Sequence, residues 1–148
     1  MANINFAGYF ISIKTGNSYV TIPNKYISMQ SYISTPHQRQ DLNSYQDNNG
    51  VLHRNVVTRY RSKCEFNTPP LLEKELKVLQ DIINNGIINA KERKIQLRHY
   101  CFDTHNYEEM RAYIPDIEFK PLRIMPNGEV LMDKVRFAFI DYGEEIED

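Results

Sequence analysis

The sequence predicts a mainly β protein: a β-sandwich or small barrel of about eight strands with one flanking α-helix at about 71–84. Three observations predict it: an alternating segment at 56–66, a helical period over 71–84, and strand-like segments separated by Gly, Pro and Asn turns. A chain of 148 residues fits one domain and buries roughly two-thirds of its unfolded surface. We expect residues 1–148 to form a single β-rich domain.

The N-terminal part predicts a hairpin followed by a short strand and a loop. Segments 9–14 and 19–22 flank Thr15-Gly16-Asn17-Ser18, whose residues tolerate positive φ. A third strand is expected at 29–33 and should stop before Pro36. Residues 37–50 then contain almost no large aliphatic side chain, which predicts a long loop or arm; loops of this length in compact domains are functional or disordered.

Side chains alternate in character from 56 to 66. One face would carry Val56, Thr58, Tyr60, Ser62, Cys64 and Phe66, and the other Val57, Arg59, Arg61, Lys63 and Glu65. A period of two over this length predicts a half-buried strand.

The period then changes to that of a helix, with apolar residues at Leu72, Leu76, Leu79 and Ile83. Thr68-Pro69-Pro70 should start this helix, and Glu73 and Glu75 complement its dipole. Asn85-Gly86 predicts a left-handed C-terminal stop.

Two more hairpins are expected after the helix. Segments 94–102 and 107–113 should pair, with Ile95, Leu97, His99 and Cys101 on one face. Segments 117–125 and 130–142 should pair across Pro126-Asn127-Gly128, because Asn-Gly is a strong hairpin signal. Pro121 places its strand at an edge or a bulge. The chain should end in an acidic tail at 143–148.

Charge and composition exclude several classes of function. Lys and Arg number 18 and Asp and Glu 19, so no global field attracts nucleic acid or an anionic membrane. The first residues lack a secretory signal pattern and no apolar run is long enough to cross a bilayer, so we expect a soluble product of the cytoplasm with no membrane partner. Two cysteines predict buried free thiols.

Neither catalysis nor a cofactor is expected. The sequence has no G-x-S-x-G elbow, no Gly-rich phosphate loop and no H-E-x-x-H. The best metal candidate, Cys64, His99, Cys101 and His105, fits no usual zinc spacing, so we expect core residues and a turn histidine in place of a metal site. Glu108 and Glu109 should point to opposite faces of a strand.

Two further binding motifs are weak. Asp47, Asn49 and Gly50 resemble part of a calcium loop, but Thr58 stands where the bidentate Glu is needed, so a β-turn is the better interpretation. A basic stripe would be formed by Arg59, Arg61 and Lys63, with Arg54 and Tyr60 nearby. Tyr60 belongs to the opposite face and the net charge is −1, so a solvated or subunit-contacting face is favoured over nucleic-acid binding.

Several strings of the sequence resemble an uncharacterised family of small proteins from tailed phages and prophages of Firmicutes. These strings are DLNSYQDNNGVLHRNVV, KCEFNTPPLL, NAKERKIQLRHYCFD, YIPDIEF and VRFAFIDYGE, and the resemblance spans 41–142. Members of that family occur among tail-morphogenesis genes and have no assigned enzymatic activity. The resemblance therefore implies a virion component and transfers no catalytic residue.

In this setting the expected fold is similar to phage tail-tube and distal-tail proteins, which are β-sandwiches with a flanking helix that assemble into rings. We expect a tail, tail-connector or baseplate-hub protein that is made in the bacterial host cytoplasm and located in the virion tail. Its partners would be other copies of itself, as a homo-oligomer, and neighbouring phage tail proteins; nucleic acid is expected only as DNA passing through a lumen. The alternative is a monomeric prophage-encoded module that binds a protein or single-stranded nucleic acid.

Contacts between subunits are expected on the arm and on the basic strand face. The arm, 37–54, would meet a neighbour, and the basic face would pair with acidic residues such as Glu144, Glu145, Glu147 and Asp148; a mobile loop and a merely solubilising tail are the alternatives. The candidate contact residues are Gln38, Arg39, Asp41, Tyr45, Asp47, Asn49, His53, Arg54, Arg59, Arg61 and Lys63.

Overall fold

The computed structural model describes residues 3–146, which form short strands around one α-helix. In chain order, the strands before the helix are β1 (Ile11–Thr15), β2 (Ser18–Thr21), β3 (Ile33–Gln38), β4 (Tyr45–Gln46), β5 (Leu52–His53), β6 (Arg61–Asn67) and β7 (Leu71–Leu72). The helix is α1 (Glu73–Asn84), and the later strands are β8 (Ile87–Asn89), β9 (Lys94–Cys101), β10 (Asn106–Tyr113), β11 (Pro121–Ile124), β12 (Val130–Met132) and β13 (Arg136–Asp141). Single 3₁₀ turns lie at Asn24–Tyr26 and Met29–Ser31.

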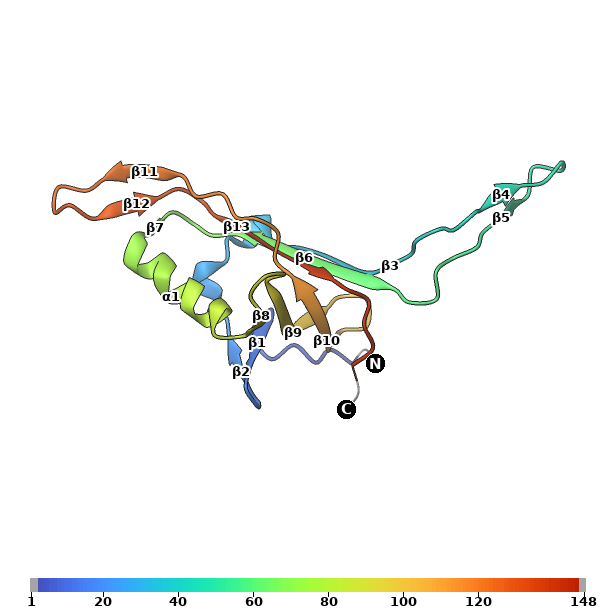
Figure 1. The fold of residues 1–148 in the computed structure, drawn as a ribbon, viewed down its shortest axis with the longest axis horizontal. Helices are drawn as coiled ribbons and strands as arrows, with labels where there is room; N and C mark the ends of the chain where they lie inside the picture. The colour runs from blue at the N-terminus through green and yellow to red at the C-terminus, as the bar shows by residue number, and fades with distance from the viewer. Residues whose placement is uncertain (1–2, 147–148) are drawn as a thin grey trace.

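Eight strands form one sheet that folds over itself without closing. The order is β2-β1-β9-β10-β13-β6-β3, with β8 also paired to β9. Only two residue pairs, Ala112 with Asp141 and Tyr113 with Ile140, join β10 to β13. The sheet bends at this narrow junction, so β13, β6 and β3 cross over β9 and β10 (Figure 1). The mainly β class with one helix is confirmed, and the barrel alternative is wrong.

The core lies between the two halves of this sheet and the helix. One half contributes Ile11, Ile13, Ile95 and Leu97, the other contributes Cys64, Phe66, Phe137 and Phe139, and α1 contributes Leu76, Leu79 and Ile83. The predicted hairpins at 9–22 and 94–113 are confirmed, as are the inward positions of Ile95, Leu97, His99 and Cys101.

Two hairpins leave this body in opposite directions along the long axis of the molecule (Figure 1). The longer one carries β4 and β5 at its outer end, and we call its residues, 39–60, the long arm. The other is formed by β11 and β12, which pair with β7 to make a three-stranded sheet. We call this β11–β12 hairpin the short arm. Pro121 lies on its edge strand at a register shift, as predicted.

Three predicted strands have different bounds. The strand expected at 29–33 begins at Ile33 and continues past Pro36, because β3 is an edge strand with a register shift where the proline sits. The strand expected at 56–66 begins only at Arg61, where pairing with β3 starts. The segment 130–142 divides into β12 and β13, which belong to different sheets.

The helix begins two residues later than predicted and ends differently. Glu75 accepts a hydrogen bond from the Leu72 backbone N–H at 3.2 Å, which satisfies one free N–H of the first turn. Asn85 keeps right-handed helical angles, and Gly86 has no positive φ, so the predicted left-handed stop is wrong. With 12 residues, α1 is too short to cross a bilayer, and the described residues hold no helix that could.

Gly86 is needed for a close approach between the helix end and β1. A Cβ at this position would collide with the Ile13 side chain and would lie 2.9 Å from the Lys14 carbonyl oxygen. We therefore expect Gly86→Ala to lower the free energy of unfolding by about 1–3 kcal/mol, the usual cost of overpacking. Denaturant unfolding measures this, with Gly128→Ala as a strained but uncrowded comparison. If Gly86→Ala and Gly128→Ala lowered the free energy of unfolding by the same small amount, the packing role of Gly86 would be contradicted.

Candidate functional site

The segment 37–50, expected as a long loop or arm, contributes one side of a hairpin, the long arm, whose strands β4 and β5 pair. Its pairing begins near the body, where the Val57 N–H donates to the Gln40 carbonyl at 2.8 Å and Asp41 bridges Val56. It continues outward to β4 and β5. The sequence missed this because β4 and β5 have only two residues each, too few to show a period of two.

The tip of the long arm is a turn built on Asp47. The Gly50 N–H donates to the Asp47 carbonyl at 3.0 Å, and one carboxylate oxygen accepts from the N–H groups of Asn49 and Val51. The other carboxylate oxygen lies 2.9 Å from Nε2 of His53. The β-turn interpretation of this segment is therefore confirmed.

Large apolar side chains are exposed along the long arm, far from the core. Exposed fractions run from 45% for Tyr60 to 61% for Tyr45, and the others are Leu42, Val51 and Leu52. A surface of this kind outside a core is typical of contact with another molecule.

Several of the predicted contact residues pair with each other within the arm. The Tyr45 ring stacks on His53 with centroids 4.9 Å apart, and Arg54 donates to Asp41 at 2.7 Å across the hairpin. These pairs stiffen the hairpin, and the Tyr45 ring stays exposed beside Leu42, Val51 and Leu52 as part of the contact surface.

The basic residues gather at the base of the long arm. Arg39 lies over the Tyr60 ring at 4.0 Å, and Arg61 and Lys63 share the outward face of β6. Together with Gln38 and Arg59, these cations line a hollow in the surface. Tyr60 thus contacts a cation, but this cation is Arg39, which follows β3, and not a residue of the basic face of β6.

The acidic tail folds back on its own chain. Glu145 pairs with Arg59 at 3.2 Å, and Glu144 pairs with Lys94 at 2.6 Å and with Arg111 at 3.2 Å. Of the predicted basic face, Arg59 thus pairs with the tail of its own molecule, whereas the partners of Glu144 lie on β9 and β10. Glu147 and Asp148 lie outside the described residues.

The short arm was not predicted as a contact surface. On or beside β11, Phe119, Leu122 and Ile124 are 45%, 52% and 74% exposed. The available signal was the Asn-Gly hairpin, preceded by apolar residues that alternate with charged ones on either side of Pro121.

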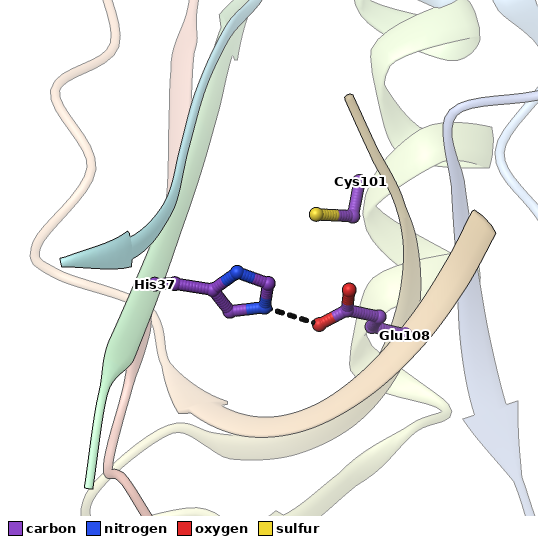
Figure 2. A group of neighbouring side chains, drawn as sticks. All are labelled: His37, Cys101 and Glu108. Atoms are coloured by element: carbon purple, nitrogen blue, oxygen red, sulfur yellow. Dashed lines mark hydrogen bonds and ion pairs between the residues drawn. The ribbon is translucent and has the colours of Figure 1, made fainter. Parts of the chain in front are cut away.

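A polar cluster lies where β3 gives way to the long arm, and Figure 2 shows its three central side chains. Nε2 of His37 is 2.6 Å from Oε1 of Glu108, and Cys101 points towards the same space. The bond to Glu108 raises the pKa of His37 against the effect of burial. Burial would raise the pKa of Glu108, but hydrogen bonds from Thr104, His37 and Cys101 outweigh it and lower that pKa. This cluster ties β3 to β10 although two strands lie between them in the sheet.

Comparison with known protein families identifies the family of this chain. A family model, the family of unknown function DUF6711, matches residues 1–142. The chain belongs to the DUF6711 family. No curated protein matches it. The matched region contains the folded sheet, both arms and the polar cluster, so all of these features belong to the DUF6711 region of the chain.

In this DUF6711 protein, the four residues considered as the best metal candidate of the sequence, Cys64, His99, Cys101 and His105, do not converge as a group. Within residues 3–146, the metal-capable donors that converge are those of His37, Cys101 and Glu108. His105 is an exposed turn residue with φ 57°, as expected, and burial raises the pKa of the Cys64 thiol to about 12. Glu108 faces His37 whereas Glu109 pairs with Arg98, so the prediction of opposite faces is confirmed.

Asp47 should make the arm tip sensitive to pH. The bond from His53 and those from the Val51 and Asn49 N–H groups lower the pKa of Asp47. A lowered pKa in the folded arm stabilises the turn above about pH 4, and the stabilisation is lost as pH falls through the lowered value. We expect a smaller protection factor for the Val51 amide, which is the ratio of its exchange rate in an unfolded chain to that in the folded protein at the same pH, at low pH and, at neutral pH, in Asp47→Ala.

Amide exchange followed by NMR measures both effects on the tip. Asp41→Ala is the matched control, because Asp41 pairs with Arg54 nearer the body and should leave exchange at Val51 unchanged. Protection at Val51 that survives both low pH and Asp47→Ala would refute the role of the carboxylate.

Proposed function

We propose that this protein is a structural component of a tailed-bacteriophage virion, in a tail, tail-connector or baseplate-hub position, and that copies assemble into rings through the long arm. The observation that supports this most is the set of large apolar side chains on a hairpin that projects from the body. The tailed-phage setting comes from the resemblance of the segments within 41–142.

Physical chemistry favours an arm that is covered in the working protein. A two-stranded hairpin is at best marginally stable alone in water. Burying a large apolar side chain contributes about 1.5–3 kcal/mol, so covering Leu42, Tyr45, Val51 and Leu52 against another molecule gives a strong driving force. We infer that the occupant of this surface is a second copy of the chain.

The two arms suit a head-to-tail contact. They extend in opposite directions, so one copy presents an arm on each side of its body (Figure 1). A contact that uses different surfaces on the two partners generates a ring when its rotation closes. β2 and β3 lie at the two edges of the main sheet. A strand from the arm of a neighbouring copy can form backbone hydrogen bonds with such an edge.

Light scattering coupled to size exclusion, over a wide range of protein concentration, tests this proposal. Rings or tubes in negative-stain images of the large species would support it. A strict monomer at every concentration would shift the balance to the monomeric binding module, and capture of a non-phage partner by that monomer would refute the virion role.

A further inference from the structure

We propose that His37, Cys101 and Glu108 form a binding site for a divalent transition-metal ion of the zinc class. The three residues come from β3, β9 and β10 and offer one imidazole nitrogen, one thiol sulfur and one carboxylate oxygen. These are the three donor types that zinc sites use. The inference does not depend on the proposed assembly.

The donor atoms lie close to the separations that a bound ion requires. All three are within 4.8 Å of one another. Tetrahedral ligation at about 2.0–2.3 Å from the ion places donors roughly 3.3–3.8 Å apart, so side-chain adjustments of about 1 Å suffice. His37 Nε2 and Glu108 Oε1, now 2.6 Å apart around a shared proton, would move slightly apart as the ion replaces that proton. Binding would release this proton and the thiol proton to solvent.

Partners behind the three donors already orient two of them. Nδ1 of His37 lies 3.4 Å from a carboxylate oxygen of Asp103, so Nε2 is the nitrogen directed at the site. Oε2 of Glu108 accepts a hydrogen bond from Thr104 at 2.7 Å, which leaves Oε1 directed at the site. A carboxylate behind a histidine ligand is the usual arrangement around bound zinc.

Burial leaves the cluster accessible to solvent on one side. Cys101 is fully buried, whereas the side chains of His37 and Glu108 are 24% and 30% exposed, so an ion has a route of entry and a solvent position for a fourth ligand. His99 lies opposite Glu108 in the β9–β10 register, and its buried Nδ1 has no hydrogen-bond partner in the described part of the chain.

The structural consequence would be a fixed base for the long arm. His37 precedes the arm by two residues and has φ 50°, and its backbone N–H donates to Ser62 at 3.1 Å. A bound ion would tie this residue to the β9–β10 hairpin across the fold of the sheet. It would therefore set the direction in which the arm leaves the body.

Cobalt titration of the full chain, first stripped with a chelator, tests the site. We expect one Co²⁺ per chain with a thiolate-to-cobalt charge-transfer absorption, and displacement by one equivalent of Zn²⁺. Cys101→Ser should remove that absorption, and Asp103→Asn should keep it while weakening affinity about 10- to 100-fold.

Cys64→Ser is the matched control, because Cys64 is an equally buried thiol outside the cluster. It should leave the absorption and the affinity unchanged. If a buried-thiol variant fails to fold, His37→Gln at the partly exposed edge strand provides the same test and should weaken binding at least tenfold. No cobalt absorption in the wild-type chain, an absorption that persists in Cys101→Ser, or an unchanged cobalt affinity in His37→Gln would overturn the proposal and leave the cluster as a hydrogen-bonded contact only.

Discussion

Replacing residues 42–55 by an Asn-Gly turn is expected to abolish self-assembly while the body stays folded. Asp41 and Val56 already face each other as a bridged pair, so a two-residue turn can join them. The excised segment carries four of the five exposed apolar side chains of the long arm and no core residue. Light scattering should then give a monomer, and the melting temperature should stay close to that of the wild type.

Point variants separate the apolar surface from the length of the arm. Tyr45→Ser combined with Leu52→Ser should weaken assembly strongly, because the pair loses about 3–6 kcal/mol of potential burial per contact. Asn48→Ser combined with Asn55→Ser changes the same arm at polar, exposed positions and should assemble normally. Equal assembly of both double variants would contradict an apolar contact, even if the deletion had an effect.

Phe139→Ala is expected to be the most destabilising single substitution, lowering the free energy of unfolding by about 3–5 kcal/mol. Phe139 is fully buried in the half of the sheet opposite β9, where its ring lies 6.5 Å from that of Phe66. Removing it leaves a cavity between the two halves of the folded sheet, which only two residue pairs join at β10 and β13.

Phe119→Ala provides the matched control for this loss. Phe119 is 45% exposed near the short arm, so the same chemical change should alter the unfolding free energy of the monomer by no more than about 0.5 kcal/mol. Urea denaturation of both variants at low protein concentration measures the difference. Similar costs for the two substitutions would show that the core does not lie between the sheet halves.

Patterns of neighbouring residues predicted the hairpins and the helix, which depend mainly on contacts that are close in sequence. The hairpins at 9–22 and 94–113 follow from alternation and turn residues, and the helix follows from its period of 3.6. Alternation from Val56 to Tyr60 was misleading, because that stretch belongs to the arm and has no neighbouring sheet to bury one face.

Long-range contacts explain what the sequence could not show. His37, Cys101 and Glu108 meet only because the sheet folds at the β10–β13 junction, and no spacing along the chain reports that fold. Gly86 was predicted as a turn residue, but its role depends on Ile13, more than seventy residues earlier in the chain. The long arm was foreseen as a region with little core, and its hairpin structure depends on pairings between residues on either side of the tip.

Site-specific photo-cross-linking at Tyr45 tests the central claim, that the long arm contacts another copy of the chain, most directly. A photoreactive phenylalanine analogue at this exposed position should give cross-linked dimers and higher species in wild-type background, with the attachment site mapped by mass spectrometry to the body or short arm of a second copy. The same analogue at exposed Lys91, on the turn between β8 and β9, should give few or none. Cross-links confined to the same molecule, or equal yields at Tyr45 and Lys91 under conditions where the protein assembles, would contradict the claim.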